Sequence, residues 1–152
     1  MRRIRKKYER PKKLWDKARI EKEKEILKKF GLRRKREIWR AEALLKKFRR
    51  LARKLIATPD EEKEKILIKK LVDLGILKEG AKVNDVLNLS VEDILKRRLQ
   101  TILVEKKLAN SVKQARQFIT HGHVKIGDRK IVYPSYLVPV QEEDKIKVEM
   151  GK

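Results

Sequence analysis

The chain has 152 residues, of which 44 are Lys or Arg and 22 are Asp or Glu, so its formal net charge is +22. A charge this large predicts a polyanionic partner, either a nucleic acid or an anionic membrane surface. The absence of cysteine excludes disulfides and thiolate zinc sites. No apolar run approaches the roughly 20 residues of a membrane span, and no signal-peptide core follows the basic start. We therefore expect a cytoplasmic protein with no membrane partner.

The first 57 residues hold most of the charge, with 25 Lys and Arg against 7 Asp and Glu, a net +18. Within them, residues 1–13 carry eight cations and one carboxylate, Glu9, and show no apolar period. This composition predicts a disordered arm that becomes ordered on a phosphate surface. A terminus that is merely solvated is the alternative.

Two helices are expected next, at about residues 16–30 and 33–57. Asp16 is placed to cap the first helix, and Gly31 to end it. The second helix ends before Thr58-Pro59, because proline cannot continue a helix. Its apolar residues are spaced by three and four, which keeps them on one side and predicts a core-facing stripe. The stripe consists of Ile38, Ala41, Leu45, Phe48, Ala52 and Leu55.

The opposite side of the second helix is basic. A run of charge on a helix is usually only solvated, but here Glu37 and Glu42 are the sole carboxylates between residues 33 and 57. We therefore predict that this face contacts RNA. Trp15 and Trp39 could stack on bases, or pack at the edge of the core. The basic face comprises Arg33, Arg36, Arg40, Lys47, Arg50 and Lys54, with Leu44 and Leu51 at its border.

Residues 58–95 form an acidic spacer, with 6 Lys and Arg against 9 Asp and Glu. A capping box at Thr58 predicts a helix over about 59–74. After a short helical turn at 84–89, a further capping box at Ser90 predicts one helix to about Lys107, with Lys96, Arg97 and Arg98 projecting near its middle. The spacer is expected to pack against its neighbours, or to face solvent or another protein, rather than RNA.

A helix that begins at Ser111 and ends at Gly122 is the clearest element of the remaining chain. The Ser111 hydroxyl can accept a hydrogen bond from the Gln114 N–H, whose side chain can reach back. Lys113, Arg116, Gln117 and Thr120 share a wet face, which we expect to pack against nothing. Alternating residues around Gly127-Asp128 predict a hairpin, and residues 145–148 a closing strand.

These residues carry a family resemblance. Leu108-Ala109-Asn110-Ser111, Ala115-Arg116, Ile119, Gly122 to Ile126, Pro134 to Val138 and Asp144-Lys145-Ile146 match, in order and spacing, the S-four RNA-binding domain, which this stretch of about fifty residues resembles. Gln100, Gly127-Asp128 and Glu143 depart from the family pattern. Residues 31–42 are similar to the amino-terminal segment of the archaeal and eukaryotic small-subunit ribosomal proteins that carry this domain.

The resemblance implies an α+β fold, with a basic helical region over residues 1–95 and an RNA-binding domain over residues 96–150. It also implies a structural constituent of the small ribosomal subunit that binds ribosomal RNA directly, nucleates assembly, and contributes to translational accuracy through neighbouring ribosomal proteins. The ribosome would be its location.

We expect RNA contact from two groups of residues, because the Ser111 helix, the end of the preceding helix and the first hairpin strand can converge on one surface. Arg116 is the strongest candidate, since its planar guanidinium can hold a phosphate bidentately. The first group is Arg33, Arg34, Arg36, Arg40, Lys47, Arg50 and Lys54; the second is Lys96, Arg97, Arg98, Ser111, Lys113, Arg116, Gln117, His121, His123 and Lys125.

Enzymatic chemistry is not expected. His121 and His123 lack a cysteine or carboxylate at metal-ligand spacing, and His121 is explained equally well by the helix dipole or by phosphate contact. No cofactor, metal or small-molecule substrate is predicted. Two alternatives share the domain. One is an RNA-modifying or aminoacylating enzyme, for which residues 1–95 offer no catalytic region; the other is a free-standing RNA chaperone or ribosome-rescue factor.

Overall fold

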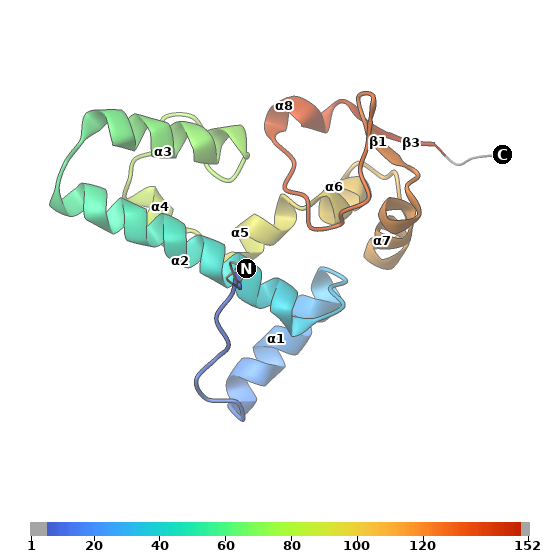
Figure 1. Cartoon of the computed structure of the whole chain (residues 1–152), viewed down its shortest axis with the longest axis horizontal. Helices are drawn as coiled ribbons and strands as arrows, with labels where there is room; N and C mark the ends of the chain where they lie inside the picture. Colours follow the sequence, from blue (N-terminus) through green and yellow to red (C-terminus); the bar gives the residue numbers. More distant parts are fainter. Residues whose placement is uncertain (1–5, 150–152) are drawn as a thin grey trace, which may run out of the picture.

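A computed structural model describes residues 6–149, so residues 1–5 of the predicted arm and residues 150–152 lie outside the description. Helices and a small sheet are both present, which confirms the α+β prediction (Figure 1). In chain order the elements are α1 Lys17–Lys29, α2 Lys35–Ala57, α3 Glu61–Asp73, α4 Asp85–Asn88, α5 Val91–Lys96, α6 Leu99–Glu105, α7 Val112–His121, β1 Val124–Ile126, β2 Arg129–Lys130, α8 Val140–Glu143 and β3 Ile146–Val148.

The long helix α2 is the centre of the first region. Figure 1 shows α3 running beside the C-terminal half of α2, and α1 at its N-terminal end. The predicted apolar stripe of α2 is buried throughout, which confirms it as core. Asp16 caps α1 as expected, because its carboxylate accepts from the Arg19 N–H at 3.3 Å.

The predicted start of α3 at Thr58 is wrong by two residues. Asp60 is the N-cap, and its carboxylate accepts from the Lys63 N–H at 3.2 Å. Pro59 disfavours a helical conformation at Thr58, which precedes it, so the acidic side chain one position after the proline takes the capping role. A shorter helix than predicted follows, ending at Asp73.

The single helix predicted from Val91 to Lys107 is also wrong, because the chain forms α5 and α6 with a break at Arg97 and Arg98. At the break, Arg97 accepts a backbone hydrogen bond from Val138 at 3.0 Å, and Leu99 donates one to Tyr136 at 2.8 Å. Arg98 forms a β-bridge with Leu137. A distant segment therefore takes backbone groups that an uninterrupted helix would use internally.

The second region packs α6 and α7 against an antiparallel sheet of order β2-β1-β3. Val124 and Ile126 of β1 are buried between the sheet and the helices. The predicted helix from Ser111, the hairpin and the closing strand are confirmed. Ser111 accepts from the Gln114 N–H at 3.2 Å, but the Gln114 side chain reaches Asn110, one residue before the cap, at 2.9 Å.

Among residues 6–149 the apolar core forms two clusters, one ending at Leu95 and the other beginning at Leu99. Leu137 packs against the first cluster although its neighbours in sequence belong to the second. The two regions are therefore in direct contact beside the α5–α6 break. Within residues 6–149, no helix has both the length and the apolar composition needed to cross a membrane.

Candidate nucleic-acid interface

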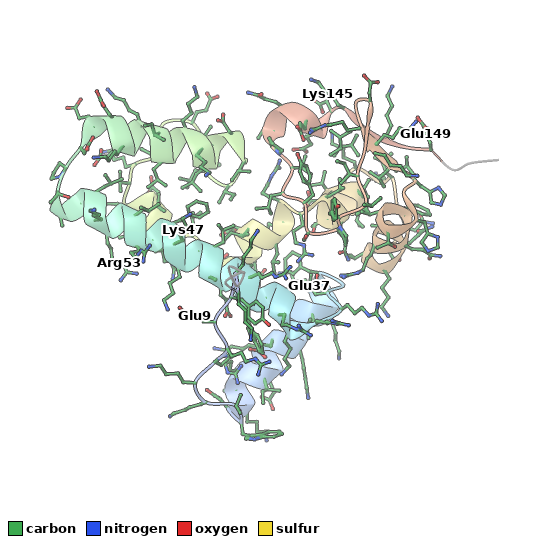
Figure 2. All side chains as sticks on the ribbon, viewed as in Figure 1. Glu9, Glu37, Lys47, Arg53, Lys145 and Glu149 are labelled. Atoms are coloured by element: carbon green, nitrogen blue, oxygen red, sulfur yellow. The ribbon has the colours of Figure 1, made fainter. Side chains whose placement is uncertain are left out.

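The carboxylate of Glu37 joins the two regions. It accepts from the Arg98 guanidinium, with Nη2 2.7 Å from Oε2, and from both terminal nitrogens of Arg116, each at 3.2 Å. The backbone N–H groups of Arg33 and Arg34 also donate to Glu37 Oε1, at 3.2 and 3.3 Å. Glu37, in the first turn of α2 (Figure 2), thus holds residues from α7 and from the α5–α6 break.

The electrostatics of this network follow from burial and pairing. Burial alone would raise the pKa of Glu37, but hydrogen bonds from Arg116 and Arg98 outweigh burial and hold the pKa below its ordinary value. Burial also lowers the pKa of the Arg98 guanidinium, and the bond to Glu37 opposes that change. Because Arg98 is only 5% exposed, its charge depends on Glu37 for neutralisation.

Around Glu37 lies a cleft of about 290 Å³, which we name the arginine cleft. Arg98 and Arg116 form ion pairs with Glu37. The other four arginines that line the cleft are solvent-exposed and have no carboxylate within 4 Å among residues 6–149. Exposed guanidiniums can bind phosphate oxygens bidentately. The cleft is lined by Arg33, Arg34, Arg36, Arg40, Arg98, Arg116, Glu37, Pro134 and Ser135.

A second hollow, of about 700 Å³, extends this surface toward the start of α7. It shares Arg33 and Arg116 with the arginine cleft and adds Ser111 and Lys113. The two hollows therefore adjoin at Arg33 and Arg116, and residues of both predicted groups lie around them.

The outer face of the sheet carries lysines that sequence reasoning missed. The strand register places Lys125 directly opposite Lys130 on one side and Lys147 on the other. Like charges in directly opposed positions destabilise a sheet, and Lys125 is paired with Glu149 at 2.6 Å. Lys130 and Lys147 could have been found from the sequence by pairing the predicted strands around the Gly127-Asp128 turn.

The buried side chain of Gln100 also joins the two regions. It is 1% exposed, and its amide nitrogen lies within 3.3 Å of the carbonyl oxygens of Phe30, Gly31 and Val112. Gly31 has a φ of +55°, and a Cβ there would come within 2.9 Å of Val112. The turn after α1 can therefore approach α7 closely only because residue 31 is glycine, and Gln100 joins the two.

The prediction that the side chains of Arg97 and Arg98 project outward from one continuous helix is wrong. Arg98 is buried against Glu37, and the half-buried Arg97 donates to Glu143 Oε2 at 2.9 Å and to the Val138 carbonyl at 3.0 Å. Both side chains turn inward because the helix breaks beside them. Lys96 stays exposed and lies 3.3 Å from Asp93, away from the arginine cleft.

The expectation that the Arg116 side of α7 packs against nothing is also wrong, because Arg116 pairs with Glu37 of α2. Sequence reasoning named Glu37 only as one of few carboxylates. Its place three residues after Arg34, at the third position of the helix-start pattern, is the signal that could have found it.

The remaining predicted residues lie outside the cleft. Lys47 and Lys54 border a different groove, between α2 and α3, and Arg50 is exposed on α2. On α7, Gln117 and His121 are exposed, and the His121 and His123 rings lie 6.2 Å apart. No group of three or more His, Asp or Glu in the described part of the chain is arranged to hold a metal ion.

The described end of the predicted arm lies against α2. Glu9 pairs with Lys46 at 2.9 Å, and the Tyr8 ring lies 6.0 Å from that of Trp39. Trp39 itself donates its indole N–H to Glu23 at 3.0 Å, as expected for edge packing, whereas Trp15 is exposed. Disorder of the arm without RNA stays a prediction.

A family model described as "S4 domain" matches residues 97–144, so the second region of this chain is an S4 domain. Similar proteins extend over both regions. "Small ribosomal subunit protein uS4" of Korarchaeum cryptofilum is 52% identical over 149 residues, covering 97% of this chain and 90% of the relative. The proteins of the same name from Saccharolobus solfataricus and Nanoarchaeum equitans are each 49% identical, covering 93% and 95% of this chain and 81% and 83% of their own lengths. The chain therefore belongs to the uS4 family of small ribosomal subunit proteins.

Proposed function

We propose that this chain is a structural protein of the small ribosomal subunit in the cytoplasm, and that it binds ribosomal RNA directly through the arginine cleft. Early binding would nucleate assembly of the subunit body, and contacts with neighbouring ribosomal proteins would contribute to translational accuracy. The role is structural rather than enzymatic. The observation that carries the proposal is the construction of the cleft from both regions, in a family whose members are ribosomal proteins.

In this proposal, phosphates of the folded RNA enter the arginine cleft and meet the four exposed guanidiniums. Arg33, Arg34, Arg36 and Arg40 bind them, while Glu37, Arg98 and Arg116 hold the two regions in a fixed relation. Because the two regions are already held together, the cleft does not have to be assembled when the RNA arrives. Contacts of this kind recognise the shape and the backbone of RNA rather than its sequence.

Lysines on the sheet and residues on α7 would widen the contact. Lys130 and Lys147 lie directly opposite Lys125 on the neighbouring strands, so the three positive charges repel one another. A phosphate bound between them would relieve this repulsion. Ser111, Lys113, Gln117, His121 and His123 belong to the proposed interface beside α7 and β1, and Lys96 and Arg50 to its margins.

Sucrose-gradient sedimentation of cell extract tests the role. We expect the chain in the small subunit at one copy per ribosomal RNA molecule, and released from it by high salt because phosphate contacts are screened. A free or strongly substoichiometric pool would instead indicate an RNA chaperone or a rescue factor. That alternative is not favoured, since the similarity to ribosomal proteins covers the helical region as well as the S4 domain.

Phosphate binding in the cleft is tested with Arg36→Ala and Arg40→Ala in one chain, measured on transcribed small-subunit ribosomal RNA. We expect the affinity to fall by about tenfold to a hundredfold, as charge-assisted bonds are lost. Arg53→Ala is the matched control, because Arg53 is an exposed arginine of the same helix that does not line the cleft (Figure 2). An equal loss with Arg53→Ala would contradict the assignment.

A further inference from the structure

A further hollow, separate from the two beside α7, lies between α2 and α3. It has a volume of about 510 Å³ and is lined mainly by aliphatic side chains, among them Leu44 and Leu51 of α2 and Ile66 of α3. We name it the lysine-edged groove, because Lys47 and Lys54 of α2 and Lys63 and Lys70 of α3 border it. These two sides are the antiparallel pair of helices in Figure 1.

Apolar surface in this groove is left in contact with water. Leu67 and Leu71 of α3 are buried in the first cluster, but Ile66 is 67% exposed and Leu51, across the groove, is 37% exposed. Burying such a side chain is favourable in proportion to the area removed from water. A concentration of exposed aliphatic residues in a groove is typical of a surface that binds a partner.

The charge around the groove is mostly positive, because four lysines and a single carboxylate, that of Asp60, line it. Among residues 6–149, Lys47, Lys54 and Lys70 have no carboxylate within 4 Å, whereas Lys63 is paired with Asp60. Lys47 and Lys54 are seven residues apart, as are Leu44 and Leu51, so each pair lies along one line on α2. Lysine stems can cover an apolar partner while their ammonium groups bind carboxylates at its edge.

We propose that the lysine-edged groove binds an amphipathic helical segment of another small-subunit protein, with apolar residues on one side and Asp or Glu beside them. This inference rests on the proposed function. The occupant is helical because two parallel lines of contact on facing helices fit anchors at positions i, i+3 or i+4, and i+7. It is acidic because three lysines without carboxylate partners border the site.

Two other occupants fit the observations less well. Bases of RNA bind proteins by stacking on aromatic rings, but Phe48, the aromatic residue of this groove, is 4% exposed and offers no ring face. A second copy of this chain would bring another net charge of +22 against a basic edge, and like charges at short range repel.

The free chain tests the chemistry of the groove without ribosomes. The probe is a designed peptide with leucines at i, i+3, i+4 and i+7 and glutamates flanking them; control peptides carry Lys in place of Glu, or Ser in place of Leu. We expect the peptide with leucines and glutamates to bind, and both control peptides to bind at least about tenfold more weakly.

Variants of the chain test the same groove. Leu51→Ser combined with Ile66→Ser should weaken binding of that peptide about tenfold. Ile56→Ser should not weaken it, because Ile56 is 46% exposed on α2 outside the groove. Equal affinity of the peptide for the parent chain and for both variants would overturn the inference.

Cross-linking in assembled subunits tests the identity of the occupant. A benzophenone amino acid replaces Ile66 in one chain and Ile56 in a matched chain, and the cross-linked products are mapped by mass spectrometry. We expect position 66, and not position 56, to mark a protein helix that has carboxylates beside apolar residues. Attachment to RNA, to a second copy or to a segment without carboxylates would overturn the inference, as would no product at position 66. Chains that failed to enter subunits would contradict the proposed function alone, since the peptide measurement judges the groove independently.

Discussion

At its N-terminal end α2 presents arginines to a cleft shared with the second region, whereas toward its C-terminal end it presents lysines to an aliphatic groove shared with α3. Both ends belong to the same basic face of one helix. Arg36 and Arg40 line the arginine cleft together with Glu37 and four further arginines. Lys47 and Lys54 stand beside Leu51 and Ile66 instead.

The difference between the two ends comes from what packs next to each. Planar guanidiniums suit bidentate contact with phosphate, while ammonium groups on flexible stems suit the rim of an apolar surface. Periodic charge therefore identifies the exposed side of a helix, and the neighbouring elements decide which ligand that side can bind. The basic face of α2 would then bind RNA at its N-terminal end and a protein helix toward its C-terminal end.

The largest effect is expected at the centre of the arginine cleft. Glu37→Ala would leave Arg98 buried without its counter-ion, so the free energy of unfolding should fall by about 3 kcal/mol. Urea unfolding at fixed ionic strength measures it. Glu42→Ala is the matched control on the exposed side of α2 and should change the value by less than about 0.5 kcal/mol. Similar losses in both variants would mean that Glu37 does not join the two regions.

Acid should weaken the same contact. The pKa of Glu37 is lowered in the folded chain, so its carboxylate stabilises the fold fully above the ordinary pKa of about 4.3. This contribution is lost as the pH falls through the lowered pKa. The difference in unfolding free energy between the parent and Glu37→Gln should therefore be constant from pH 7 to about pH 5 and shrink below about pH 4. A difference that grew on acidification would contradict this assignment.

Arg116 offers a smaller and more specific effect. Arg116→Lys keeps the charge but loses the bidentate contact with Glu37, so we expect a loss of about 1 kcal/mol in the free energy of unfolding. Lys113→Arg, on the exposed surface of α7, serves as the control and should be neutral. If Arg116→Lys were neutral as well, the fork geometry would not matter at this junction.

The weakest expected effect concerns the sheet. Lys147→Ala should raise the stability slightly, by a few tenths of a kcal/mol, because it removes a like charge directly opposite Lys125. It should lower RNA affinity about threefold through one lost phosphate contact. Thermal unfolding and RNA titration on the same sample measure the two effects. A loss in stability without a loss in binding would remove the sheet from the proposed interface.

Local rules predicted what depends on local structure. Spacing by three and four found the buried stripe of α2, and short polar side chains found the caps at Asp16, Ser90 and Ser111. Alternation around Gly127-Asp128 found the hairpin. These features are determined by residues within a few positions of one another.

Features that depend on distant segments were not predictable in this way. The break at Arg97 exists because residues near Leu137 pair with it. Glu37 organises the cleft because its partners come from residues 98 and 116. The groove depends on how α3 packs on α2 and on which apolar residues it leaves uncovered. The charge and spacing of residues along a helix predict which residues form a surface, but not which distant residues contact them.

The most direct test removes two positive charges from each end of the basic face of α2. Chains with Arg36→Ala plus Arg40→Ala, and with Lys47→Ala plus Lys54→Ala, are titrated with small-subunit ribosomal RNA at several salt concentrations. For the parent, log K should fall with log salt at a slope of roughly −4 to −9. We predict that the arginine pair makes the slope shallower by about 1.5 and lowers the affinity at least about tenfold, while the lysine pair leaves the slope unchanged and the affinity within about threefold. Equal changes in the two chains would contradict the division of the face between RNA and protein.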